Sequence, residues 1–253
     1  MRYLGYLPSI RHKQIRCALP LTERQIVVSS YGEDRVVLYE VHNESDYVPK
    51  WSAPLPHPRG ICADERRCYV ASYGDPLGSI SAVDRFTGHG IWTNACPRPR
   101  GVALDNDQLC CTQVSTGHVA IHSTSTGAQT DSFAVELVTP RGIALVESGV
   151  YVVAESDRNC VTKVSRNAVL RRQNDLSHCN DVACHGASVA VSLWYDRVVV
   201  LLNASDLSVL CKTSVLGPSY GLAMISMTPT EVLVGDDCLD CVHVLRHVNA
   251  ITH

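Results

Sequence analysis

A short motif returns along this chain at nearly constant spacing and limits what the chain can fold into. Residues 58–64 read PRGICAD, residues 99–105 read PRGVALD, and residues 140–145 read PRGIAL. Weaker copies follow at residues 180–183 (NDVA) and 220–223 (YGLA), so the phase of the repeat falls at positions 60, 101, 142, 181 and 221. Such a period is typical of proteins built from repeated supersecondary units. The chain is predicted to be a repeat protein.

Each repeat holds short apolar segments separated by turn residues. In the second repeat these are residues 60–63, 68–73, 79–83 and 90–95. Helical repeats need apolar residues spaced three and four apart, whereas these segments alternate and are rich in Val, Ile, Thr and Cys. Four strands in a unit of this length are typical of a β-propeller blade.

The two chain ends are expected to meet in one blade. The sixth repeat ends one strand short, and residues 2–7 form an unassigned strand ahead of the first repeat. Pairing them would remove the open edges of a linear array. We predict an all-β, six-bladed β-propeller of four-stranded antiparallel blades, the last blade closed by the N-terminal strand. A single domain over residues 1–253 is expected, with repeats at approximately 15–55, 56–96, 97–137, 138–176, 177–216 and 217–253, and with residues 1–8 completing the last.

Three short motifs resemble the NHL repeat family. They are PRGIA at residues 140–144, VYVVA at residues 150–154, and DRVVL and DRVVV at residues 34–38 and 196–200. The Trp-Asp signature of other propellers is absent, because the three Trp residues are followed by Ser, Thr and Tyr. The resemblance implies a six-bladed fold, and some NHL domains bind RNA on one face.

Composition narrows the class of protein. The chain is 45% hydrophobic and carries 22 Lys and Arg against 25 Asp and Glu, which does not favour a dedicated nucleic-acid binder. Residues 1–13 lack the apolar core of a signal peptide, and no apolar run is long enough for a membrane helix. Most of the twelve cysteines lie in strand-like segments and are interpreted as buried free thiols, although sequons at residues 43–45 and 203–205 favour export. An intracellular, cytoplasmic, soluble protein is expected.

The residue before the repeat phase is expected to lie on one rim of the central channel. It is Arg59, Arg100 and Arg141 in three adjacent repeats, then Asn180 and Tyr220, and Ile15 or Arg16 in the first repeat. Like charges this close repel unless an anion or nearby acids compensate. Two alternatives follow: a bound anionic ligand, or pairing with loop acids. The candidate acids are Glu33, Asp34, Asp75, Glu155, Asp157, Asp196, Asp236 and Asp237.

Aromatic residues are expected on the same face, at the ends of the second strands. With the rim residues they define a predicted ligand-binding face: Arg59, Arg100, Arg141, Tyr31, Tyr73, Trp194, Tyr195 and Tyr220. Arginines with aromatic rings stack bases and hold phosphates in single-stranded RNA readers. Simple packing of the rings is the alternative.

An alternative enzyme site is predicted at the channel mouth. Its residues are His57, His178, Asn180, Asp181 and Glu155. Propeller lyases use histidines and a metal, and propeller lactonases use Asn-bearing inner strands, but the arginines would repel a metal ion. The CxxC at residues 238–241, with His243 and His247 nearby, lacks the four ligands of a zinc site and is interpreted as incidental. No catalytic residue, metal or cofactor is expected.

The leading functional hypothesis is a non-catalytic NHL-like propeller scaffold. It would bind a protein segment, an anionic ligand or RNA through one face, with a protein partner favoured and no membrane association. One alternative is a propeller lyase or lactonase-type enzyme at the channel mouth. The other is a structural subunit that contacts its neighbours in a larger assembly with its sides.

Overall fold

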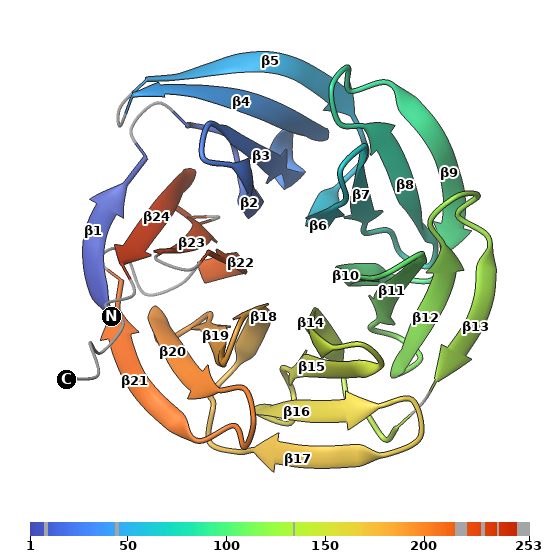
Figure 1. Ribbon diagram of the computed structural model, residues 1–253, viewed down its shortest axis with the longest axis vertical. Coiled ribbons are helices and arrows are strands. Elements are labelled where there is room, and N and C mark those ends of the chain that lie inside the picture. The colour runs from blue at the N-terminus through green and yellow to red at the C-terminus, as the bar shows by residue number, and fades with distance from the viewer. Residues whose placement is uncertain are drawn as a thin grey trace.

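The fold is a ring of six four-stranded antiparallel sheets, a six-bladed β-propeller (Figure 1). The computed structural model describes residues 1–7, 10–43, 46–133, 135–215, 222–228, 231–236 and 238–246. Within these residues no helix is long and apolar enough to cross a membrane. The predicted fold class is confirmed.

Each blade runs from an inner strand at the channel to an outer strand at the rim (Figure 1). Blade 1 contains β2 (Ile15–Thr22), β3 (Gln25–Ser30), β4 (Arg35–Asn43) and β5 (Asp46–Pro54). Blade 2 contains β6 (Pro58–Ala63), β7 (Arg67–Ser72), β8 (Gly78–Asp84) and β9 (Gly90–Cys96). Blade 3 contains β10 (Pro99–Asp105), β11 (Gln108–Gln113), β12 (His118–Ser123) and β13 (Gln129–Phe133).

The remaining blades repeat this order. Blade 4 contains β14 (Pro140–Glu147), β15 (Val150–Glu155), β16 (Cys160–Ser165) and β17 (Val169–Gln173). Blade 5 contains β18 (Cys179–His185), β19 (Ser188–Leu193), β20 (Val198–Asn203) and β21 (Val209–Ser214). Blade 6 contains β22 (Leu222–Met227), β23 (Glu231–Asp236), β24 (Cys241–Arg246) and β1 (Arg2–Tyr6).

The N-terminal strand closes the ring, as predicted. β1 pairs antiparallel with β24, with Arg2 opposite Arg246 and Tyr6 opposite His243. A bulge between Tyr3 and Gly5 interrupts this pairing. The last blade therefore takes strands from both ends of the chain, which leaves no unpaired gap in the sheet order.

The hydrophobic core lies between neighbouring blades. One cluster joins Tyr69 and Ile80 of blade 2 to Leu109 of blade 3, and another joins Ile121 of blade 3 to Tyr151 of blade 4. Each of these five side chains is fully buried. Because alternate residues of each strand face opposite neighbours, every blade contributes to two clusters.

The glycines of the repeated motif allow inner strands to approach closely. A Cβ on Gly101 would lie 2.5 Å from the carbonyl oxygen of Arg141, and one on Gly142 would lie 1.8 Å from Asp181 Oδ1. Neither contact leaves room for a side chain. The narrow channel therefore requires glycine at this position of the motif, because the backbone of one blade touches the next there.

Short loops attach each blade to the next on the face where the inner strands begin. The residue three positions before the phase has a left-handed backbone in Gln14, His57 and His178, with φ of 53°, 45° and 47°. In each case its backbone N–H donates to a side chain of a neighbouring blade at 2.7 Å; the acceptors are Asp240, Asp34 and Asn159. These bonds fix the positions of the residues that follow, at the channel mouth.

Candidate functional site

Strand register places four arginines at one level of the channel mouth. Pro58, Pro99 and Pro140 open their inner strands opposite the last residue of the second strand, and Ile15 does the same in blade 1. The next residue in each strand is therefore equivalent. These residues form what we call the arginine cluster: Arg16, Arg59, Arg100 and Arg141.

The last two blades depart from this pattern. Blade 5 places Asn180 at the same level, because Cys179 pairs with Leu193. In blade 6 Leu222 pairs with Asp236, so the register puts Ala223 at the equivalent position. The predicted residue there, Tyr220, lies outside the described part of the chain.

Asn180 joins two members of the arginine cluster. Its Oδ1 accepts a hydrogen bond from Arg100 Nη2 at 2.7 Å and another from Arg141 Nη1 at 2.9 Å. Arg100 thus reaches from blade 3 to blade 5 and is only 7% exposed. Asn180 supplies an amide dipole where two guanidinium charges meet, but it supplies no negative charge.

Aromatic rings form the walls of the cluster. The Arg59 guanidinium lies between the rings of Tyr31 and Tyr73, 4.8 and 4.7 Å from their centroids. Arg141 lies 5.5 Å from the Trp194 ring, and Trp194 stacks on Tyr195 with the planes only 8° apart. Stacking occupies the faces of a guanidinium and leaves its N–H edge available to an oxyanion.

Arg16 of the cluster and Arg98 also lie beside these aromatic rings. Arg16 lies 5.1 Å from the Tyr31 ring, and Arg98 lies 5.9 Å from the Tyr73 ring. The sequence offered Arg16 only as one of two choices, because the first repeat lacks the Pro-x-Gly motif. The four aromatic residues of the described predicted face therefore all lie beside arginines or beside one another.

The cluster is short of negative charge. In the described residues no carboxylate lies within 4.0 Å of Arg59, Arg100 or Arg141. Burial and the charge of Arg16 lower the pKa of Arg59 to about 10, and burial with the neighbouring arginines lowers the pKa of Arg100. The charge of Asp181 acts on Arg100 and that of Asp157 acts on Arg141, and each partly offsets the lowering of the arginine pKa.

Several hydrogen-bond donors of the cluster have no acceptor. The Nε atoms of Arg59, Arg100 and Arg141 are buried and make no hydrogen bond within the described structure, and the same holds for Trp194 Nε1. Buried donors without acceptors are rare in folded proteins, because each loses its bond to water. Ten such side-chain atoms occur in the described residues, and these four lie around one mouth, where a single oxyanion can accept from them.

The loop acids that the sequence offered as partners are bound elsewhere. Glu33 pairs with Arg35, Asp75 with Arg98, Glu155 with Arg158, and Asp236 with Arg197. Asp34 lies 3.8 Å from His57 Nε2, and Asp157 accepts from Thr139 at 2.6 Å. Asp196 makes no contact with the cluster, and Asp237 is outside the described residues. These contacts hold the acids away from the arginine cluster, although the charge of Asp157 still acts on Arg141.

The residues of the alternative enzyme site do not converge. His57 packs on Tyr31 with ring centroids 4.7 Å apart, and His178 packs edge-on against Tyr195 at 4.3 Å. Glu155 is fully buried inside blade 4, where Arg158 and the Val138 backbone N–H bind its carboxylate. The two histidines belong to blades 2 and 5, on opposite sides of the ring (Figure 1).

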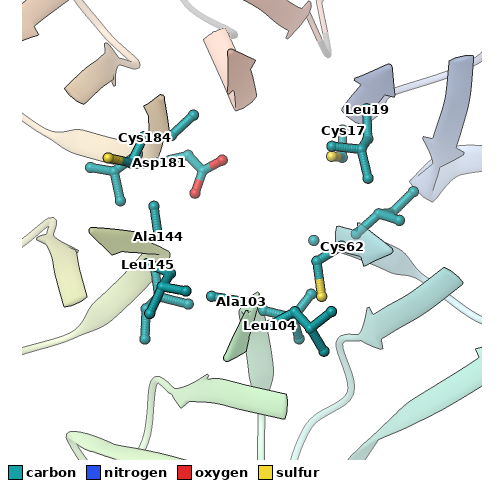
Figure 2. Close-up of a pocket in the computed structure, with 15 residues that line it drawn as sticks. Cys17, Leu19, Cys62, Ala103, Leu104, Ala144, Leu145, Asp181 and Cys184 are labelled. Carbon is teal, nitrogen blue, oxygen red and sulfur yellow. The ribbon is translucent and has the colours of Figure 1, made fainter. Parts of the chain in front are cut away.

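A cavity of about 230 Å³ lies in the channel directly below the arginine cluster. Its upper wall includes Gly60 and Asp181, which follow Arg59 and Asn180 in their strands. Figure 2 shows the Asp181 carboxylate pointing into the cavity, while the other labelled side chains are aliphatic or thiol groups. Burial raises the pKa of the Cys17 thiol to about 12, and that of Cys62 also rises. One carboxylate among protonated thiols does not make a metal site.

One buried group of metal-ligand type exists in the described residues, and an arginine already occupies it. Asp236, Cys241 and His243 bring ligand atoms within 4.8 Å of one another. Arg197 Nη2 donates to Asp236 Oδ2 at 2.6 Å, and His243 Nε2 lies 2.7 Å from the same oxygen. The guanidinium supplies the positive charge that a metal would bring. The CxxC adds no ligand pair, because Cys238 is exposed whereas Cys241 is buried.

Thiol exposure gives a direct check of this arrangement. Cys238 is the exposed cysteine, while Cys62, Cys184 and Cys211 are half-buried and the other eight are buried. We expect a thiol reagent at mildly alkaline pH to label one site rapidly in the native protein, because burial raises the pKa of most other thiols. Cys238→Ser should abolish the rapid phase. Rapid labelling of Cys17 or Cys110 would contradict the packing.

Comparisons with known proteins identify the fold. No protein-family model matches this chain, and no curated protein is significantly similar to it in sequence. The solved structures that resemble it include a selenomethionine-substituted virginiamycin B lyase from Staphylococcus aureus, at 12% identity and a TM-score of 0.66, covering 92% of this chain and 80% of that chain. A catalytically inactive variant of that lyase with quinupristin matches at 13% identity and a TM-score of 0.67, with the same coverage.

A WD40 propeller matches equally well. The WD40 β-propeller domain of Doa1 aligns at 10% identity and a TM-score of 0.68, covering 98% of both chains. At these identities the similarity shows the fold alone, which enzymes and WD40 domains share. The resemblance to NHL repeats remains a prediction. The chain has the β-propeller fold.

Proposed function

We propose that this protein is a non-catalytic, NHL-like propeller scaffold that binds a protein segment carrying an acidic group into the arginine cluster. The observation that carries the proposal is the set of buried donors without acceptors on Arg59, Arg100 and Arg141. A carboxylate accepts several N–H bonds at once and supplies the missing negative charge. The aromatic walls offer area for the flanking peptide.

The charge around the mouth favours one compact acidic group over RNA. Asp34 and Asp75 stand on the same face and are 59% and 63% exposed. A nucleic-acid backbone carries a phosphate at every step and would meet these acids, whereas a single acidic side chain entering the centre would not. An acidic residue within an otherwise neutral or basic segment fits this pattern of a positive centre and a negative rim.

The geometry gives little support to catalysis. His57 and His178 pack on aromatic rings, with no nucleophile within hydrogen-bond reach in the described structure, whereas Glu155 binds Thr162 and Cys160 where it is fully buried. General acid–base work needs such reach. The lyase or lactonase hypothesis therefore rests on similarity of fold, and a WD40 domain has the same fold.

The proposal is tested by titrating a fluorescent peptide with a central glutamate. We expect the double variant Arg59→Gln/Arg141→Gln to bind at least about tenfold more weakly than the wild type, since each lost charge-assisted hydrogen bond costs about 1.5 kcal/mol or more. The matched control is Arg24→Gln/Arg66→Gln, which removes two exposed charges from turns that connect first and second strands. A second peptide carries glutamine in place of the glutamate. The wild type should bind this neutral peptide weakly, with an affinity similar to that of the double variant for the acidic peptide. Equal affinities for all of these pairs would contradict the proposal.

A further inference from the structure

The charge at the channel mouth further defines the acidic group that the arginine cluster can take. The cluster holds four guanidinium groups, and two carboxylate charges act on it, Asp181 on Arg100 and Asp157 on Arg141. With both carboxylates ionised, these six side chains keep an excess of two positive charges. A ligand carboxylate brings one negative charge, whereas a phosphate monoester brings about two at neutral pH. A phosphate therefore matches the excess more closely.

The donors without acceptors reach the mouth from four successive blades. Arg59 belongs to blade 2, Arg100 to blade 3 and Arg141 to blade 4, and Trp194 follows the second strand of blade 5. Each has a buried N–H group that makes no hydrogen bond within the described residues. A carboxylate accepts hydrogen bonds close to its own plane, whereas the three terminal oxygens of a phosphate monoester are arranged tetrahedrally. Donors from several sides of the ring suit the tetrahedral acceptor.

The guanidinium groups are held in place before a ligand arrives. Arg100 is 7% exposed, and its Nη2 donates to Asn180 at 2.7 Å. Arg59 is held between the rings of Tyr31 and Tyr73. Fixed side chains lose little conformational entropy on binding, and the planar guanidinium matches pairs of phosphate oxygens. The mouth is thus a preformed site for a tetrahedral oxyanion.

Exposed apolar side chains surround the mouth on the same face. Leu77 lies in the loop between β7 and β8, Val138 lies in the connection that enters β14, and Tyr195 lies in the loop after β19. All three are exposed. A free phosphate would contact none of them, whereas the residues beside a phosphorylated side chain would cover part of this surface. The surroundings therefore favour a phosphate that is attached to a protein segment.

We infer that the segment bound by this face carries a phosphorylated side chain, whose phosphate dianion enters the arginine cluster. The inference rests on the proposed function, because it specifies the acidic group that the same site takes. The exposed acids Asp34 and Asp75 stand on the rim and disfavour a second phosphate close to the first. The segment therefore presents one phosphate to the centre of the ring.

The test compares three fluorescent peptides that have the same alanine and leucine residues around a central phosphoserine, glutamate or serine. We expect the wild type to bind the phosphoserine peptide at least about tenfold more tightly than the glutamate peptide, and the serine peptide most weakly. Arg59→Gln/Arg141→Gln should lose most of the preference for phosphoserine over glutamate, and Arg24→Gln/Arg66→Gln should keep it. The three affinities of the wild type decide the matter even where a variant does not fold.

The pH dependence distinguishes a dianion from a general acidic group. The second pKa of a phosphate monoester is about 6 and that of glutamate is about 4.3, so only the phosphate takes up a proton between about pH 7.5 and 5.5. The preference for phosphoserine over glutamate should therefore fall several-fold over this range. Other titratable groups stand on this face, namely His57, His178, Asp34, Asp75 and Asp157. They face both peptides alike, so the ratio of the two affinities isolates the phosphate.

The outcomes separate this inference from the proposed function. Equal affinities for the phosphoserine and glutamate peptides, both tighter than serine, would overturn the inference and leave an acidic-segment site in place. A preference that does not change with pH would also overturn it. Inorganic phosphate that competes with the same Kd as the phosphoserine peptide would show a site for free phosphate and overturn it too. Equal affinities for all three peptides would overturn the proposed function together with the inference.

Discussion

Asp236→Asn is expected to lower the free energy of unfolding by about 3–5 kcal/mol, the range for removing one partner of a buried ion pair. Asp236 is fully buried, and its Oδ2 binds both Arg197 and His243. Its Oδ1 accepts from the backbone of Cys238 and Leu239. Asparagine keeps this second role but leaves the Arg197 charge without its counter-charge, next to the blade that closes the ring.

The loss of stability in Asp236→Asn is expected to depend on pH. Burial raises the pKa of Asp236, but hydrogen bonds from His243 and Arg197 outweigh burial and hold it below its ordinary value. The stabilisation is therefore complete above the unfolded pKa of about 4 and is lost as pH falls through the lower folded pKa. Urea titrations should show the difference between the two proteins shrinking below about pH 4.

A control on the same strand separates burial from charge. Glu231 of β23 faces Arg246 at 3.7 Å, and their side chains are 37% and 58% exposed. Glu231→Gln is expected to change stability by less than about 1 kcal/mol, because exposed pairs are screened by water. A loss as small for Asp236→Asn would show that the Arg197 contact contributes little.

Gly142→Ala is expected to cost about 3 kcal/mol or more, at the upper end of the cost of overpacking. The new Cβ would lie 1.8 Å from Asp181 Oδ1 and 2.6 Å from Asp181 Cα, so the inner strands of blades 4 and 5 would have to separate. Gly101→Ala meets the Arg141 backbone at 2.5 Å and should be similarly destabilising. Chemical denaturation measures both.

The chain offers a neutral glycine for comparison. Gly90 begins β9 on the outer rim, and a Cβ there would meet nothing within 4 Å. Gly90→Ala should change stability by no more than about 0.5 kcal/mol, as for other unconstrained surface sites. If Gly142→Ala were as stable as Gly90→Ala, the close approach of the inner strands would be wrong.

The fold could be predicted from the sequence because each blade corresponds to one local sequence repeat. The spacing of the Pro-Arg-Gly motif and the alternation of each strand predict blades, and the spare strand at residues 2–7 predicts how the ring closes. The reason why the motif needs glycine became clear only from the structure, because the backbone of Gly142 faces Asp181, a residue of another blade. Spacing within a repeat indicates which residues are equivalent, but it does not show what they touch across the channel.

The site was predictable in its residue types but not in its contacts. Arg59, Arg100 and Arg141 could be assigned to one rim from the repeat phase alone. The hydrogen bond that Asn180 accepts from Arg100, 80 positions away, could not be predicted. A long side chain that reaches across the ring leaves no signal in the sequence. Two of the candidate acids show the same difficulty: Glu155 is bound by Arg158 of its own blade, and Asp236 of blade 6 is bound by Arg197 of blade 5.

The central claim is that the arginine cluster binds an anion, and heat unfolding tests it without knowledge of the partner. The probe is inorganic phosphate, compared with chloride at equal ionic strength. An anion that binds only the folded protein adds RT ln(1 + [L]/Kd), about 2.7 kcal/mol at one hundred times Kd, which raises Tm by several degrees in a chain of this size.

Three proteins are compared in this measurement: the wild type, Arg59→Gln/Arg141→Gln, and the control Arg24→Gln/Arg66→Gln. Phosphate should raise Tm of the wild type and the control by the same several degrees, and should raise Tm of the cluster variant by far less. A general salt effect would act on all three alike. An equal rise of Tm in all three proteins, or none in any, would contradict the assignment of the arginine cluster as an anion site.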